Sequence, residues 1–138
     1  MGPPACLIVG VDTSPESVAA LEWALRLSGG LQCRVIAVHA IGLLEEGGYR
    51  QRPDMAGLID EARERVGLAA GFPVEWIEED GPPADVIVRV AERERADLIV
   101  VGSRGLGQAP RLLGSTSEAV VAHARLPILV VPAMEVGR

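Results

Sequence analysis

Four short stretches of this chain are apolar at every position, and they constrain its fold more than any other feature. None of them alternates apolar with polar residues, as a strand with one solvent-exposed face would. Such runs are typical of parallel strands that helices cover on both faces. The four runs are residues 7–9, 35–38, 98–101 and 128–131.

Helical patterns lie between these apolar runs. The clearest one places apolar residues three or four positions apart, at Met55, Leu58, Ile59, Ala62, Val66 and Ala69. Residues 74–79 add a weaker strand. Because strands and helices alternate along the whole chain, the sequence predicts an α/β fold with a single-domain, open, doubly wound parallel sheet of five strands and four helices.

Proline, glycine and serine mark the expected ends of these elements. Ser14-Pro15 predicts a helix cap followed by proline in the first helical turn, and Gly29-Gly30 predicts the end of that helix. Gly81-Pro82-Pro83 is expected to open the third helix. Pro127 is expected to separate the fourth helix from the last strand.

Length and charge limit the classes of function. A chain of 138 residues, 49% of them hydrophobic, is long enough for one core, so residues 1–138 are expected to form a single domain. The net charge of −6 argues against a nucleic-acid or anionic-membrane partner. The apolar run 5–11 is too short for a membrane span and has no basic leader, so we expect a cytoplasmic protein.

The chain contains no lysine, and all 13 basic residues are arginines. This excludes a Walker A lysine and a Schiff base. The charge of a bound triphosphate would have to be met by backbone amides, hydroxyls, a metal ion or an arginine such as Arg104 or Arg111. Cys6 and Cys33 lack the spacing of a redox or zinc motif and are expected to be buried free thiols.

A glycine-rich loop follows the third apolar run and leads into a helix. Gly102, Gly105 and Gly107 let the main chain approach an anion, and the next helix begins near Gly114-Ser115. Free amides at a helix start attract phosphate, so the loop predicts a nucleotide site. Ser115 and Glu118 also have the spacing of a capping box.

Gly102-x2-Gly105 followed by Gly114-Ser115 resembles the G-x2-G-x9-G-[ST] signature of the ATP-binding branch of the universal stress protein family. Eight residues, 106–113, separate Gly105 from Gly114, where the family has nine. The resemblance extends over almost the whole chain and includes residues 11–14, 81–84 and 126–131. It implies a Rossmann-like adenine nucleotide-binding fold with strand order 3-2-1-4-5, in which Asp12 and Gly102 face one crevice.

The same resemblance implies ATP as the ligand, with Mg²⁺ reaching the protein only through the nucleotide phosphates. Asp12 would accept hydrogen bonds from the ribose or the adenine amine, although it is also a suitable turn residue before Ser14-Pro15. The main chain of Val38 would contact adenine. The expected binding residues are Val11, Asp12, Thr13, Val38, Gly102, Arg104, Gly105, Gly114, Ser115, Thr116 and Ser117.

Catalytic residues are not expected. His39 follows the second apolar run and could face the crevice, and His123 lies late in the fourth helix, but neither has a serine or cysteine partner in recognisable spacing. Without a positioned base or an activated nucleophile, ATP hydrolysis would be slow. A hydride-transfer enzyme is disfavoured because the loop lacks the G-x-G-x-x-G pattern.

The resemblance therefore implies an ATP-binding regulatory protein of the stress response that acts on protein partners still to be identified. The apolar edge strand from Ile128 to Val131 predicts that two subunits pair through it. The alternative is a member of the branch that does not bind ATP, acting as a dimerisation or partner-interaction module. The short loop and Pro110, which removes an amide donor, favour this alternative. An adenylating enzyme is a distant third, because the chain has no room for a second domain.

Overall fold

The computed structural model describes residues 4–12, 14–41, 54–69, 71–103 and 114–132. In chain order the elements are β1 (Cys6–Gly10), α1 (Pro15–Leu31), β2 (Arg34–Ile41), α2 (Met55–Val66), β3 (Glu75–Asp80), α3 (Pro83–Arg93), β4 (Leu98–Gly102), α4 (Ser115–His123) and β5 (Ile128–Val131). The predicted alternation of five strands and four helices is confirmed.

The five strands form one parallel sheet in the order β3-β2-β1-β4-β5, as expected. The strand β1 lies at the centre, where Val9 pairs with Ala37 of β2 and with Val100 of β4. The chain leaves β1 in one direction and β4 in the other. The ends of these strands therefore diverge, which is where open α/β sheets bind ligands.

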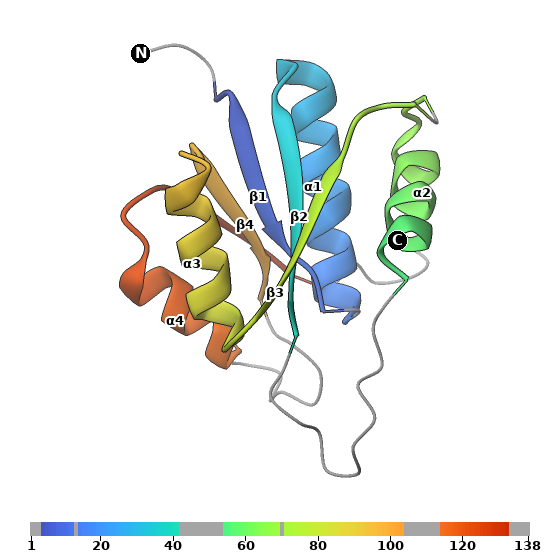
Figure 1. Ribbon diagram of the computed structural model, residues 1–138. Coiled ribbons are helices and arrows are strands. Elements are labelled where there is room, and N and C mark those ends of the chain that lie inside the picture. Colours follow the sequence, from blue (N-terminus) through green and yellow to red (C-terminus); the bar gives the residue numbers. More distant parts are fainter. Residues whose placement is uncertain (1–3, 13, 42–53, 70, 104–113, 133–138) are drawn as a thin grey trace, which may run out of the picture.

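Helices cover both faces of the sheet (Figure 1). On one face, α1 and α2 pack on a cluster that includes Val9, Ala37 and Val100. On the other face, α3 and α4 pack on a cluster that includes Ile8, Ile36 and Ile99. Because consecutive strand residues point to opposite faces and both faces are covered, the four runs 7–9, 35–38, 98–101 and 128–131 are apolar at every position, whereas the edge strand β3 is not.

Helix α1 shows one boundary that the sequence predicted wrongly. It starts as expected, with Ser14 as N-cap and Pro15 in its first turn, but it continues through Gly29 and Gly30 to Leu31. Gln32 ends it in a left-handed conformation (φ 54°). A Cβ at Gly29 would lie 3.0 Å from the side chain of Leu68, which follows α2. The glycine therefore lets α1 pack closely against Leu68, and it does not end the helix.

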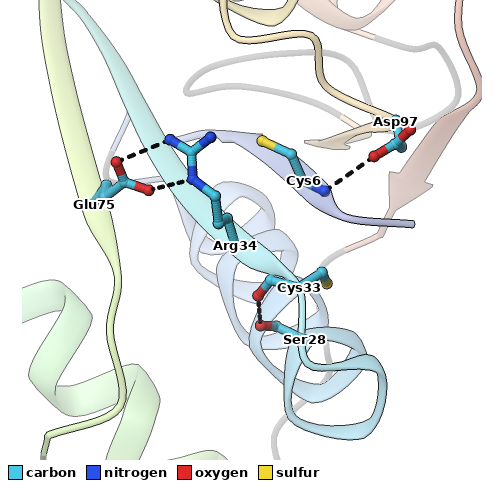
Figure 2. A network of polar contacts seen from close by, with 6 residues as sticks. All are labelled: Cys6, Ser28, Cys33, Arg34, Glu75 and Asp97. Atoms are coloured by element: carbon cyan, nitrogen blue, oxygen red, sulfur yellow. Dashed lines mark hydrogen bonds and ion pairs between the residues drawn. The ribbon is translucent and has the colours of Figure 1, made fainter. Parts of the chain in front are cut away.

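Polar contacts tie the strands together at the amino end of the sheet (Figure 2). The Cys6 amide donates to Asp97 Oδ2 (3.0 Å), and Arg34 forms two hydrogen bonds with the Glu75 carboxylate. Both thiols are buried and free, as predicted, and they point away from each other. Burial raises the pKa of the Cys6 thiol, so it remains protonated and unreactive at neutral pH.

The longest helix, α1, has 17 residues and carries charged side chains along its length. In the part of the chain that the structure describes, none of the helices has both the length and the apolar character that a membrane span requires.

Candidate nucleotide site

A pocket opens at the carboxyl ends of the central strands. Its walls come from the end of β1 and the turn after it, the last residues of β2, the start and middle of α3, the end of β4 and the first turn of α4. The lining residues are Gly10, Val11, Asp12, Ser14, Ser17, Val38, His39, Ala40, Pro83, Ile87, Val101, Gly102, Thr116 and Ser117. The pocket volume is about 60 Å³.

The turn between β1 and α1 is held by three polar side chains. Asp12 Oδ1 accepts from the Ser14 amide (2.9 Å), and Ser14 Oγ accepts from the Ser17 amide (3.2 Å) as the N-cap of α1. Ser17 Oγ in turn accepts from the Asp12 amide (3.1 Å) and donates to the Ser14 carbonyl (3.1 Å). The turn role considered for Asp12 is thus present, and its carboxylate keeps capacity for further donors.

The β1–β2 ladder ends beside this turn. The Val11 amide donates to the Val38 carbonyl (2.9 Å). The Asp12 amide donates to Ser17 Oγ, so the ladder does not continue at Asp12. The main-chain groups of alternate strand residues point to the same side. Ala40 has the same parity as Val38, whose carbonyl faces β1. The amide and carbonyl of Ala40 therefore point to the position next to β2 that β1 no longer occupies.

His39 connects the same two segments through its side chain. Its Nδ1 lies 2.8 Å from the Val11 carbonyl oxygen. A carbonyl can only accept, so Nδ1 carries the proton of this hydrogen bond. The imidazole thereby fixes the position of the turn that contains Asp12.

The start of α4 forms the opposite wall. Gly114 is the N-cap, with an extended backbone, and its amide donates to the Ser103 carbonyl (2.7 Å). Ser115 is the first helical residue and makes no capping bond, so the capping box predicted for Ser115 and Glu118 is wrong. A glycine cap has no side-chain acceptor for the first amides of the helix.

Gly102 has a structural role that the sequence did not indicate. A Cβ at this position would lie 2.7 Å from the backbone carbonyl carbon of Glu16 in α1. The Gly102 carbonyl also accepts a hydrogen bond from Ser117 Oγ. Close packing of β4 against the start of α1 therefore explains this glycine without a ligand.

The sequence profile of the universal stress protein family matches residues 7–132. This chain belongs to that family. Universal stress protein Rv1636 of Mycobacterium tuberculosis (strain ATCC 25618 / H37Rv) is 31% identical over 137 residues, which cover 91% of this chain and 94% of the relative. Universal stress protein MJ0531 of Methanocaldococcus jannaschii is 30% identical over 138 residues, 91% of this chain and 80% of the relative.

A solved structure shares the fold as well. The crystal structure of a universal stress protein in complex with cAMP superposes with a TM-score of 0.72 and 28% sequence identity, and the match covers 96% of this chain and 100% of the other. The fold described above is therefore that of a universal stress protein.

The predicted binding residues of this universal stress protein fall into three groups. Six of them line the pocket: Val11, Asp12, Val38, Gly102, Thr116 and Ser117. Gly114 and Ser115 lie at the start of α4, beside the pocket. Thr13, Arg104 and Gly105 lie outside the described residues.

Sequence reasoning missed several pocket residues. Ala40 lies just beyond Val38, and only the register of β1 against β2 shows that the ladder opens there. His39, in contrast, was expected as a residue that could face the crevice, and it lines the pocket. Ser14 was predicted as a cap, whereas Ser17 and its hydrogen bond from the Asp12 amide were not predicted. Pro83 and Ile87 belong to α3 and reach the pocket through tertiary packing alone.

Proposed function

We propose that this universal stress protein is a regulatory adenine nucleotide-binding protein of the cytoplasm, with ATP and Mg²⁺ as its ligand and at most slow hydrolysis. One observation carries the proposal: the open end of the β1–β2 ladder and the amides at the start of α4 border the same pocket. The open end of the ladder offers a main-chain amide and carbonyl that suit the edge of a purine. The start of α4 offers amide donors that suit phosphate.

We expect the base to bind at the end of β2. A main-chain amide and carbonyl side by side complement the acceptor and the amine on the edge of adenine, and Ala40 presents such a pair toward the gap beyond β1. The carbonyl of Val38 already accepts from Val11, so Ala40 is better suited than Val38 to this contact, although a carbonyl oxygen has a second lone pair. Asp12 lines the same pocket, and its carboxylate can accept hydrogen bonds from the ribose hydroxyls.

We expect the phosphates to bind at the start of α4. Helix starts bind anions through free amides and the helix dipole. The start of α1 is already capped by Ser14 Oγ, whereas α4 begins at a glycine and makes no side-chain capping bond. Thr116 and Ser117 of its first turn line the pocket. The start of α3 also borders the pocket, but Pro82 and Pro83 have no amide proton to donate. Of the three helix starts beside the pocket, α4 is therefore the best phosphate site.

The cAMP complex of the structural relative supports an adenine nucleotide as the ligand. The pocket volume of about 60 Å³ is far below the roughly 300 Å³ at which ligand pockets usually begin. A nucleotide would thus occupy this pocket with part of its surface and extend beyond it.

A regulatory role fits the lining of the pocket better than turnover. Asp12 and His39 are its two titratable side chains among the described residues, and both hold the β1–α1 turn. Neither is paired with a nucleophile. The output of binding would then be a change in what the protein associates with.

A partner-binding module that does not bind ATP is the second candidate. Gly102 and Ser117 each have a structural partner in the described fold, and so does the Gly114 amide. The signature residues could therefore be retained for packing alone. The loop of eight residues between Gly105 and Gly114 also favours this candidate.

We propose a homodimer in either case, formed by pairing of β5 with its copy. The two edge strands differ in chemistry. The β3 edge carries Glu75, Glu78, Glu79 and Asp80, which oppose pairing, while β5 has only apolar side chains, from Ile128 to Val131. An uncharged edge is the one that can add a second chain.

The test begins with the protein as purified. It is denatured, and the released small molecules are identified by mass spectrometry. The stripped and refolded protein is then titrated with ATP, ADP, AMP and GTP while its thermal unfolding is followed. Stabilisation by adenine nucleotides and not by GTP would support the first candidate. A folded dimer that no nucleotide stabilises would support the second.

A further inference from the structure

We propose that the adenine ring of the bound nucleotide packs against Ile87 of α3, and that Gly10 of β1 positions this side chain. Ile87 is then a ligand-contacting residue, and Gly10 is a positioning residue that acts through it. The inference rests on the proposed function, because it concerns how the same pocket holds the base. It predicts that the two positions affect nucleotide affinity jointly and not independently.

The tip of the Ile87 side chain lies against the end of β1. Gly10 is the last residue of that strand, and a Cβ at this position would lie 2.6 Å from Ile87 Cδ1 and 3.4 Å from Ile87 Cγ1. The optimal separation of two non-bonded carbons is about 3.5–4.0 Å. The terminal methyl group of Ile87 therefore occupies space that a side chain at position 10 would need.

The backbone conformation does not explain the glycine at position 10. Gly67 and Gly81 have left-handed backbones, with φ of 82° and 135°, whereas Gly10 lies in a strand and outside this region. An alanine could adopt the same backbone. Its Cβ would lie 3.7 Å from Val101 Cγ1, which is an ordinary contact. The contact that a side chain would disturb is the one with Ile87.

Both residues belong to one apolar wall of the pocket. Gly10 pairs with Val38 in the sheet, and Val38 belongs to the cluster on which α3 packs, as does Ile87. The apolar wall consists of Gly10, Val38, Ala40, Ile87 and Val101, all of which line the pocket. Ligand sites combine such walls with a few polar groups, and an aromatic ring packs well against them. A base that binds beside Ala40 would meet the wall that includes Ile87.

The Ile87 side chain can move at its tip more easily than at its attachment to the helix. It is 4% exposed and belongs to a buried cluster with Val86 and Val90 of the same helix. The helix and this packing hold its Cα and Cβ, whereas the terminal methyl group can rotate about a single bond. The pocket, of about 60 Å³, is open space that both Gly10 and Ile87 border. A methyl group added at position 10 should push the tip into this space and leave less room for the base.

A double-mutant cycle with ATP as the probe tests the coupling, with affinities measured by calorimetry on the nucleotide-stripped protein. Gly10→Ala should weaken ATP binding by about tenfold, the effect that one methyl group has in an apolar pocket. Ile87→Val removes Cδ1, the atom that the new Cβ would meet at 2.6 Å. In the Ile87→Val background, Gly10→Ala should therefore change the affinity by less than about twofold. An equal loss in both backgrounds would overturn the proposal.

Two further variants are matched controls, and urea denaturation checks that each variant is folded. Ile36→Val truncates a residue of the same buried cluster that is not among those that line the pocket. The loss caused by Gly10→Ala should persist in this background. Gly30→Ala, whose Cβ would have nothing within 4 Å, should leave ATP affinity unchanged. If Ile36→Val abolished the effect of Gly10→Ala as Ile87→Val does, the coupling would be a general property of the core and the proposal would fail.

Nuclear magnetic resonance of the unchanged protein gives a reading that does not depend on the folding of Gly10→Ala. The δ1 methyl groups of isoleucine are labelled with ¹³C, and Ile87→Val identifies the Ile87 signal by its loss. With ATP bound, we expect a nuclear Overhauser effect between this methyl group and a ring proton of adenine. Bound ATP without that effect would reject the inference and leave the proposed function in place. Failure of ATP to bind the unchanged protein would contradict the proposed function, and the inference with it.

Discussion

A Cβ at Gly102 would lie 2.7 Å from the backbone carbonyl carbon of Glu16, so β4 ends directly against the first turn of α1. Backbone cannot give way as a flexible side chain can. Gly102→Ala should consequently lower the free energy of unfolding by about 2 kcal/mol. Urea denaturation measures the change. Gly30→Ala, where the Cβ has nothing within 4 Å, is the matched control and should be neutral or slightly stabilising.

Ser14 and Ser115 precede or begin helices in similar sequence patterns, but only Ser14 caps one. Its Oγ accepts from the Ser17 amide, and the residue is fully buried. Ser14→Ala should cost about 1 kcal/mol of stability. Ser115→Ala should change stability by less than about 0.5 kcal/mol, because Ser115 makes no capping bond. Equal losses in thermal or urea unfolding would contradict the assignment of the caps.

Asp12 can be tested for its two roles separately. Asp12→Asn keeps an oxygen for the Ser14 amide and should preserve stability, whereas Asp12→Ala removes the acceptor and should destabilise the turn. If the carboxylate binds the ribose, Asp12→Asn should still weaken nucleotide binding, by about tenfold. Full affinity in Asp12→Asn would leave Asp12 as a turn residue only.

Two proline variants test the predicted dimer. The Pro127 carbonyl accepts from the Ile99 amide of β4, and the Val131 carbonyl accepts from the Ser103 amide just after β4. Main-chain groups of residues with this parity therefore face β4, and the amide of Val130 points away from the sheet. Val130→Pro should produce a folded monomer at micromolar concentration in light scattering. Leu129→Pro removes an amide that faces β4 and should destabilise the fold itself. A monomeric wild-type protein would contradict the predicted dimer.

The arginines of α3 make one contribution to stability dependent on pH. Hydrogen bonds from Arg93 and then from Arg89 hold the pKa of the Glu79 carboxyl below its usual value. A lowered pKa stabilises the folded state at neutral pH, and this contribution is lost as pH falls below about 4.5. Glu79→Gln should be destabilising by less than about 1 kcal/mol at pH 7, since the arginines are half exposed. The difference should shrink toward pH 3, while Glu61→Gln on the exposed side of α2 should show no such trend.

The sheet was predictable because every strand but β3 is a continuous apolar run, and the order of the strands followed from the resemblance. What failed were local signals that tertiary contacts override. Gly29 and Gly30 are weak helix formers, yet α1 continues through them because Gly29 packs against Leu68. The serine at position 115 follows the cap instead of forming it.

The site was predictable at its motifs and not between them. Asp12, Gly102 and Ser117 belong to sequence patterns and do line the pocket. Ala40 carries no pattern, because its place depends on where β1 stops pairing with β2. His39 was expected as a residue that could face the crevice, but its hydrogen bond to the Val11 carbonyl was not predicted. The role of Gly102 could not be read either, since the sequence does not show that the backbone of Glu16 lies against it.

The most direct test of the account is isothermal titration of the nucleotide-stripped protein with ATP in Mg²⁺, beside Gly114→Val. We predict saturable binding to the unchanged protein. We also predict loss of binding in the variant, whose branched side chain lies where the start of α4 must approach phosphate. No binding of ATP to the folded, unchanged protein would contradict the central claim and leave a partner-binding module. Unchanged affinity in Gly114→Val would show that the phosphates bind elsewhere.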